Sequence, residues 1–284
     1  MNLSLLVATV NRVAPLQKLF ESLARQTYMD FEVLVADQNP PEILGDLITK
    51  YSKIFPLRVF PTPHRGVSQA RNALLPHTRG ELIAFPDDDC FYAPDVVERI
   101  VENFHRHPHL HGLLGQRVLV DATERYLVAR PITQQTVNRF SAFRQSETYL
   151  QFYRREVIET ISGFAPMLGP GTGLPYGCGE DTDYLLRALA AGYHVSRAEG
   201  ARIYHPAPEM KMPDVVKMHA YGRGRMYLLR KHRFPLWFKL ATVLYPLAIL
   251  AVDFTKHGPG AARYRWAMFK GRLSGLFQAE DTKE

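Results

Sequence analysis

The sequence predicts an α/β fold with a mostly parallel sheet flanked by helices. Apolar segments of strand length alternate with segments whose apolar residues recur at helical spacing. That alternation is typical of parallel strands joined by crossover helices. The 284-residue chain is 46% hydrophobic and 22% charged, an ordinary globular composition with enough residues for a sizeable core. Ligands of such sheets bind at the carboxyl ends of the strands.

Each element is predicted from its local pattern. Residues 3–9 and 31–37 are apolar runs of strand length, and residues 14–26 carry leucines and a phenylalanine at helical spacing. Further strands are expected at 57–60, 81–85, 111–121 and 125–129. Further helices are expected at 43–51, 67–75, 95–105, 181–192 and 213–231. Glycine and proline are frequent in residues 163–179, which are therefore expected to form a loop.

Positive charge is concentrated near the C-terminus. The net charge of +7 divides into −1 for residues 1–204 and +8 for residues 205–284. Such a tail suits an anionic partner, such as nucleic acid, phospholipid or a phosphorylated substrate. A solvated basic tail without a partner is the alternative. The sequence holds no recognised nucleic-acid-binding motif, so nucleic acid is not an expected partner.

The tail also holds an apolar segment. Residues 240–252 carry no charge, but these 13 residues are fewer than the roughly 20 that a membrane-spanning helix needs, and they include Pro246. Basic residues flank the segment, and aromatic residues lie in and around it: Trp237, Tyr245, Tyr264 and Trp266. These features favour a helix lying in the membrane surface. A buried helix hairpin packed on the rest of the chain is the alternative.

The cysteines and the N-terminus bear on the compartment. Cys90 and Cys178 are too few for a disulfide framework, and free thiols in a reducing compartment are expected. The apolar start of the chain lacks a basic segment and a small-residue cleavage site, so no signal peptide is predicted. The chain is therefore expected on the cytoplasmic side.

Three adjacent carboxylates follow the predicted strand 81–85: Asp87, Asp88 and Asp89. They repel one another, and this costs stability unless a cation is present. Hard oxygen ligands suit Mg²⁺ or Mn²⁺. A metal ion there would neutralise a diphosphate leaving group as a Lewis acid. An exposed acidic turn or a helix cap is the alternative.

Three other segments carry candidate chemistry. Glu180 and Asp181 open a predicted helix, where a carboxylate is able to take a proton as a general base, although acids in a first turn also stabilise a helix. Gly66 and Arg71 lie at the start of another helix, where backbone N–H groups and a guanidinium suit phosphate. His205 follows a short strand pattern and is either a structural residue or a metal ligand.

As an ordered set, these segments resemble the inverting glycosyltransferases of family 2, of the bacterial cell-surface polysaccharide type, which have the GT-A fold. Val7-Ala-Thr9-Val-Asn11-Arg12 is similar to the family's first strand and nucleotide loop. Arg65-Gly66 through Ala70-Arg71-Asn72 is similar to its NxGxxxARN segment, and Phe85-Pro-Asp87-Asp-Asp89 is similar to its DxD region. Glu180-Asp181 resembles its ED motif. The resemblance covers residues 1–206, and it departs from the family pattern at His64-Arg65 and Pro86.

The resemblance implies a role for each of these residues. Asp89 is the expected main metal ligand, with Asp87 and His205 beside it. Asp181 is the expected base, with Glu180 next to it. Contacts to the nucleotide sugar are implied for Thr9, Asn11, Arg12, Asp37, Gly66, Arg71, Asp87 and Asp88, with Asp37 in the place of an acid that binds uracil or ribose. In the tail, Arg223 and Arg225 are expected either to clamp the diphosphate or to face lipid headgroups.

These roles predict a metal-dependent inverting glycosyltransferase that moves a sugar from a UDP- or GDP-sugar to a hydroxyl of a glycan or lipid-linked acceptor in cell-surface polysaccharide synthesis. Mg²⁺ or Mn²⁺ is the expected cofactor. The predicted domains are a catalytic domain, 1–212, and a basic amphipathic helical tail, 213–284. Residues 1–110 form the nucleotide-sugar-binding half and 111–212 the acceptor-binding half. The expected location is cytoplasmic and peripheral on the inner face of the cell membrane. A nucleotidyltransferase and a non-catalytic scaffold that binds membranes or polyanions are the alternatives.

Overall fold

The computed structural model describes residues 1–63, 66–121, 123, 125–128, 135–144, 146–207 and 215–277, without the side chains of Val128, Lys256 and His257. The chain divides into two compact units. The first comprises Met1–Phe164 and Tyr184–Ala207, and the second comprises Ala165–Asp183 and Pro208–Glu284. The predicted domain boundary at residues 212 and 213 and the departure from the family pattern at His64-Arg65 lie outside the described residues.

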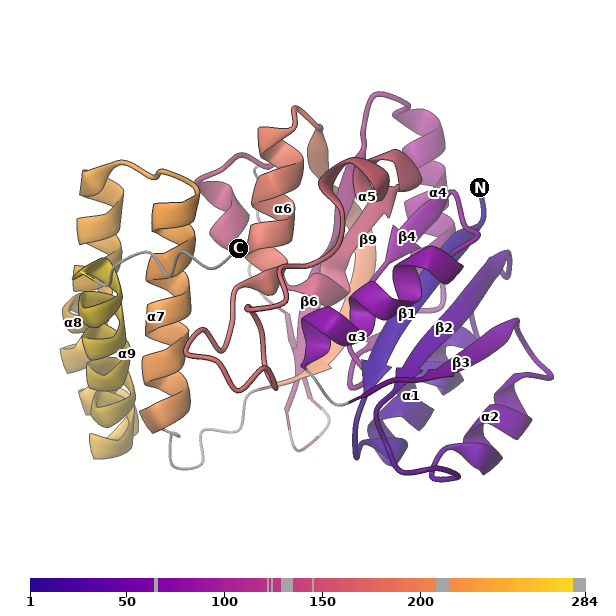
Figure 1. Cartoon of the computed structure of the whole chain (residues 1–284), viewed down its shortest axis with the longest axis horizontal. Helices are drawn as coiled ribbons and strands as arrows, with labels where there is room; N and C mark the ends of the chain where they lie inside the picture. Colours follow the sequence, from indigo (N-terminus) through magenta and orange to yellow (C-terminus); the bar gives the residue numbers. More distant parts are fainter. Residues whose placement is uncertain are drawn as a thin grey trace. The chain divides into compact units, whose positions relative to one another are not determined.

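A nine-stranded sheet forms the centre of the first unit (Figure 1). Hydrogen bonds join its strands in the order β3-β2-β1-β4-β8-β6-β9-β5, and β7 pairs with β6. The strands are β1 (Leu3–Thr9), β2 (Phe31–Asp37), β3 (Leu57–Pro61), β4 (Leu82–Ala84), β5 (Phe91–Tyr92), β6 (Gly112–Val120), β7 (Tyr126–Val128), β8 (Gln151–Arg154) and β9 (Val195–Pro206).

The sheet is parallel in the half formed by β1 to β4 and mixed in the other half. β1 pairs in parallel with β2 and β4, and β2 with β3, as the alternation of strands and helices predicts. β8 is antiparallel to β4 and β6, and β5 is antiparallel to β9. The sequence analysis missed β5 and β8 because two to four residues are too few to show a period of two.

Helices cover both faces of this sheet. Leu3, Leu5 and Val7 of β1 share one core with helices α1, α2 and α4, while α3 packs on β1 and β2 from the opposite face. On that second face, the α6 residue Tyr184 stacks on Phe164, with ring centroids 4.4 Å apart. The helices are α1 (Val13–Leu23), α2 (Gly45–Tyr51), α3 (Val67–Leu74), α4 (Val96–Arg106), α5 (Arg155–Ile161) and α6 (Glu180–Ala190), with short 3₁₀ helices at Leu75–His77, Ser141–Phe143 and Thr148–Leu150.

The strand register gathers polar residues at one edge of the sheet. Thr9, the last residue of β1, pairs with Asp37, the last residue of β2. One residue earlier on β1, Ala8 forms an isolated parallel bridge with Asp87. Because parallel strands end at the same edge, the loops after β1, β2 and β4 meet there.

Three helices form most of the second unit: α7 (Val215–Lys231), α8 (Leu236–His257) and α9 (Pro259–Phe277) (Figure 1). α7 and α9 approach each other at a seam of glycines. A Cβ atom built on Gly271 would lie 2.2 Å from the carbonyl oxygen of His219, and one built on Gly222 would lie 2.7 Å from that of Met268. No larger side chain fits at either position without moving the backbones apart.

The apolar helix of the tail is longer than the sequence analysis predicts. α8 continues through Pro246 for 22 residues, and Leu236–Thr255 is long and apolar enough to cross a membrane by length and composition. The uncharged segment in the sequence is only 13 residues long because Lys239 and Asp253 bound it. The helix includes both, and the Asp253 carboxylate is neutralised by Arg265 of α9 at 2.5 Å. Only 11% of this segment is buried, so α8 is not a buried core helix.

Candidate active site

Two of the predicted acids and the predicted histidine lie together in the first unit. Ligand atoms of Asp87, Asp89 and His205 all lie within 4.8 Å of one another. His205 Nε2 lies 3.2 Å from Asp89 Oδ1. Two carboxylates and an imidazole suit Mn²⁺, and Mg²⁺ binds mainly through oxygen ligands. The donor set therefore fits the divalent cation that the sequence predicts.

Strand pairing explains how His205 reaches the aspartates. The short strand β5 follows the aspartates directly, and its Phe91 pairs with Tyr204 in antiparallel β9. His205 is the next residue of β9, so this register brings its ring to Asp89. The Nδ1 atom of His205 lies 2.8 Å from the carbonyl oxygen of Pro206, and this leaves Nε2 directed at the carboxylate. A hydrogen bond of this kind orients a histidine that binds a metal.

The loop after β1 contacts the other side of the aspartate triplet. The Thr9 hydroxyl donates to Asp88 Oδ2 at 2.8 Å. Arg12 Nη1 donates to Asp88 Oδ1 at 3.1 Å and to Asp89 Oδ2 at 2.6 Å. The Arg12 guanidinium thus offsets part of the repulsion among the three adjacent carboxylates. Thr9 and Arg12, both predicted from the sequence, belong to the same cluster as the triplet.

Arg71 forms an ion pair with Asp87, the first aspartate of the triplet. Its side chain is 2% exposed, and Nη2 donates to Asp87 Oδ1. Nη1 donates to the Thr148 hydroxyl at 3.3 Å, and the guanidinium lies 5.5 Å from the centre of the Phe164 ring. Burial of Arg71 against these partners fixes the position of Asp87.

Burial and nearby charges shift the pKa values of the three aspartates in different directions. Burial raises the pKa of Asp88 to about 6, against the hydrogen bond from Thr9 and the charge of Arg12. Burial also raises the pKa of Asp87, although Arg71 opposes it. For Asp89, the effect of burial is outweighed by the hydrogen bond and charge of His205, so its pKa is lowered. Asp89 is therefore the member of the triplet that most readily carries negative charge.

The remaining predicted nucleotide contacts lie near the same edge of the sheet. Asp37 Oδ1 accepts hydrogen bonds from the backbone N–H of Asn39, at 2.9 Å, and from its side-chain amide, at 2.7 Å. The N–H of Asn11 donates to the Asn39 side chain, which links the loops after β1 and β2. Gly66 caps α3 with φ at 89°, a left-handed conformation that favours glycine.

The Glu180–Asp181 pair belongs to the second unit. Asp181 Oδ1 accepts hydrogen bonds from the backbone N–H and hydroxyl of Thr182, in the first turn of α6. Two residues later, Asp183 is fully buried and pairs with Lys231 at 2.7 Å and His232 at 2.8 Å. Asp183 thus anchors the basic end of α7.

Of the two tail arginines, Arg225 lies near Asp181 within the second unit. Burial, with the positive charge of Arg272, lowers the pKa of Arg225, and the charges of Cys178 and Asp181 oppose this effect. Arg223 lies on the same helix, beside Gly275 of α9. The diphosphate contact predicted for both arginines stays a prediction.

Sequence reasoning missed two residues that support the site. The buried ring of Tyr149 stacks on His205, with centroids 4.7 Å apart and planes 17° from parallel. Thr148 holds Arg71. Both precede the unpredicted strand β8, and no motif marks them.

Comparison with known proteins agrees with this fold. The sequence model of the family described as "Glycosyl transferase family 2" matches residues 4–162. Beta-monoglucosyldiacylglycerol synthase of Nostoc sp. is 29% identical over 177 residues, which cover 57% of this chain and 37% of that protein. The glycosyltransferase YwdF of Bacillus subtilis is 26% identical over 216 residues, which cover 72% of this chain and 74% of that protein. The chain thus spans only 37% of the length of the Nostoc relative.

Two solved structures share the fold across nearly the whole chain. S. aureus TarS 1–349 has a TM-score of 0.61 at 19% identity, covering 97% of this chain and 90% of that one. Mannosyltransferase PcManGT from Pyrobaculum calidifontis, in complex with GDP-Man and Mn²⁺, has a TM-score of 0.65 at 14% identity, covering 97% of this chain and 87% of that one.

The mixed α/β fold and the match to these transferases define an enzyme, a glycosyltransferase of the GT-A type. Within that class, the chain belongs to glycosyl transferase family 2. The predicted fold class and enzyme class are therefore confirmed, and the nucleotidyltransferase alternative is set aside.

Proposed function

We propose that the chain is a metal-dependent inverting glycosyltransferase that transfers a sugar from a UDP- or GDP-sugar to a hydroxyl of a glycan or lipid-linked acceptor in cell-surface polysaccharide synthesis. The observation that carries the proposal is the cluster of Asp87, Asp89 and His205 at the carboxyl edge of the sheet. Two neighbours in fold support the donor class, because TarS has been crystallised with UDP-GlcNAc and PcManGT with GDP-Man and Mn²⁺.

Within this proposal, Asp89, Asp87 and His205 would hold Mg²⁺ or Mn²⁺. The bound ion would supply Lewis-acid stabilisation of the diphosphate leaving group. Arg71 and Thr9 keep Asp87 and Asp88 in place for the donor. Arg223 and Arg225 are the proposed cations for the departing diphosphate.

The chemical step requires a base, and we assign that role to Asp181. Its carboxylate takes the proton of the acceptor hydroxyl. The acceptor oxygen forms a bond to the anomeric carbon, and the bond from that carbon to the diphosphate oxygen breaks. A single displacement inverts the anomeric centre. Glu180 is the proposed neighbour that orients the base or the acceptor.

A donor screen tests the proposal. The protein is incubated with UDP- and GDP-sugars one at a time, with Mn²⁺ or Mg²⁺, and released nucleoside diphosphate is measured. Release from one donor is expected, and a chelator is expected to abolish it, because the aspartates lose the cation they hold. The scaffold alternative predicts no release from any donor, and release that persists in the chelator would count against the metal.

We further propose that the tail docks on an anionic membrane surface from the cytoplasmic side. α8 is about 33 Å long, which gives it an extended side to lay on a membrane surface. Large apolar side chains are exposed on it: Leu236, Trp237, Leu240, Leu244, Tyr245, Val252 and Phe254. Arg233 and Lys239 lie at its start, and such cations attract acidic headgroups.

Liposome flotation tests this docking. In vesicles with acidic phospholipid, the double substitution Trp237→Asp and Leu244→Asp is expected to reduce the floated fraction several-fold, because charges are costly in an apolar interface. Both residues are more than half exposed, at 63% and 57%, so the fold should tolerate the changes. Ile54→Asp, at a 46% exposed site in the first unit, is the matched control. Equal flotation of the double variant and the control contradicts membrane docking by α8.

A further inference from the structure

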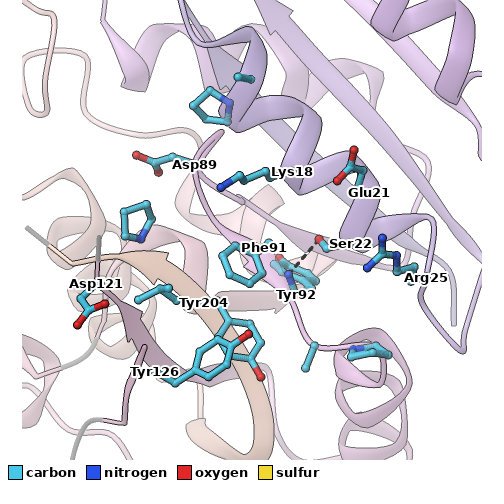
Figure 2. Close-up of a pocket in the computed structure, with 16 residues that line it drawn as sticks. Lys18, Glu21, Ser22, Arg25, Asp89, Phe91, Tyr92, Asp121, Tyr126 and Tyr204 are labelled. Carbon is cyan, nitrogen blue, oxygen red and sulfur yellow. Dashed lines mark hydrogen bonds between the residues drawn. The ribbon is translucent and has the colours of Figure 1, made fainter. Parts of the chain in front are cut away.

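A pocket of about 770 Å³ lies beside the aspartates in the first unit (Figure 2). α1 lines it on one side, and β5, β7 and the ends of β6 and β9 line it on the other. The volume is within the range of small-molecule sites. Asp89 is the one member of the aspartate triplet that lines this pocket, so the pocket borders the proposed metal site at this ligand.

Aromatic rings form one wall. Phe91 and Tyr204 stack with centroids 4.9 Å apart and planes 12° from parallel, and Tyr126 leans on Tyr204 at 5.2 Å. Strand pairing holds this cluster, because Phe91 pairs with Tyr204 between β5 and β9, and Tyr126 lies on β7 beside the end of β6. Tyr126 is 61% exposed. A tyrosine presents an apolar ring face together with a hydroxyl, which suits a ligand whose apolar and polar surfaces alternate.

The opposite wall is polar and carries both signs of charge. Lys18 and Glu21 are three residues apart and project from one side of α1, and Arg25 lines the pocket from the turn that follows the helix (Figure 2). Asp121 lines the pocket from the end of β6. Because this wall carries both cationic and anionic side chains, it does not favour a phosphate over a neutral ligand. They suit a neutral ligand rich in hydroxyl groups, since a hydroxyl both donates and accepts.

The donor and the pocket use different sides of the aspartate triplet. The residues proposed for the donor that contact the triplet are Arg71, on Asp87, Thr9, on Asp88, and Arg12, on Asp88 and Asp89, and none of the three lines the pocket. Neither Asp87 nor Asp88 is among the residues that line the pocket. The occupant of the pocket is therefore a second molecule, held next to Asp89.

From this arrangement we infer that the pocket binds sugar residues of the acceptor. The aromatic wall takes the apolar faces of the sugar rings, and the α1 wall takes their hydroxyls. The inference rests on the proposed transferase function and assigns the acceptor class as saccharide. The determinants of acceptor recognition are then Tyr126, Lys18, Glu21 and Arg25.

Binding of defined trisaccharides tests the inference. Cellotriose, chitotriose, maltotriose and mannotriose are each titrated into the full chain and followed by saturation-transfer NMR. We expect at least one to bind, and we expect Tyr126→Ala and Arg25→Ala each to weaken it by about tenfold, as loss of one good contact does. The matched controls are Phe140→Ala, at a 40% exposed aromatic residue, and Lys53→Ala, at an exposed lysine of the first unit.

Release of nucleoside diphosphate by the unaltered protein is measured in parallel, and this separates the two ideas. If the protein turns over its donor but binds no trisaccharide, or binds one equally well after Tyr126→Ala and Phe140→Ala, the pocket assignment is overturned and the transferase function stands. If no donor is turned over, the proposed function itself fails. Weakening by the pocket substitutions alone supports the assignment.

Discussion

Replacing Asp89 with asparagine is expected to lower sugar transfer by about three orders of magnitude and to weaken Mn²⁺ binding in parallel. Asp89 is the carboxylate on which His205 and Arg12 both converge, and its pKa is held low by the hydrogen bond and charge of His205 against the effect of burial. The amide keeps the shape of the side chain but removes its negative charge. The asparagine would be a weaker ligand for a divalent cation, and the stabilisation that a bound cation would give the diphosphate leaving group would be reduced.

The measurement combines initial rates of nucleoside diphosphate release with a Mn²⁺ titration followed by calorimetry. Asp30→Asn is the matched control, since Asp30 is an exposed aspartate of the same unit outside the cluster. Thermal unfolding should be little changed in both variants, because Arg12 keeps its hydrogen bond to Asp88. Unaltered Mn²⁺ affinity in Asp89→Asn would remove Asp89 from the metal site.

Local sequence patterns predicted the parallel half of the sheet, whose strand ends carry part of the candidate site. β1 and β2 begin and end where their apolar runs do, and parallel pairing then places Thr9 opposite Asp37. The aspartate triplet could be located because it begins three residues after the end of the buried strand β4, and ligands bind at the strand ends of parallel sheets. In this half, the site residues lie at strand ends that the local sequence pattern already predicts.

The other half of the site depends on contacts between distant segments, which no local period encodes. The pairing of two-residue β5 with β9 decides that His205 meets Asp89. The sequence left His205 open between a ligand and a structural residue because that pairing has no signal of its own. Tyr149, which stacks on His205, was missed for the same reason.

Replacing Asp181 with asparagine is expected to lower transfer by about three orders of magnitude while nucleotide binding stays near normal. The reason is that an amide cannot accept the proton that the acceptor hydroxyl must lose. Damage to the helix should be small, because the side-chain oxygen of asparagine is able to keep the hydrogen bonds that Asp181 Oδ1 accepts from Thr182. The expected signature is therefore a loss of kcat with little change in the dissociation constant of the nucleoside diphosphate.

A second first-turn aspartate separates catalysis from helix capping. Asp46 lies in the first turn of α2, is exposed, and has no proposed role in binding or catalysis, so Asp46→Asn changes the helix-dipole interaction alone. If Asp181→Asn lowers kcat while its thermal unfolding shifts no more than that of Asp46→Asn, loss of an acidic charge from the first turn of a helix does not account for the loss of activity. If Asp181→Asn retains full activity, Asp181 merely opens its helix, and the search for the base moves to Glu180, the adjoining carboxylate of the same turn.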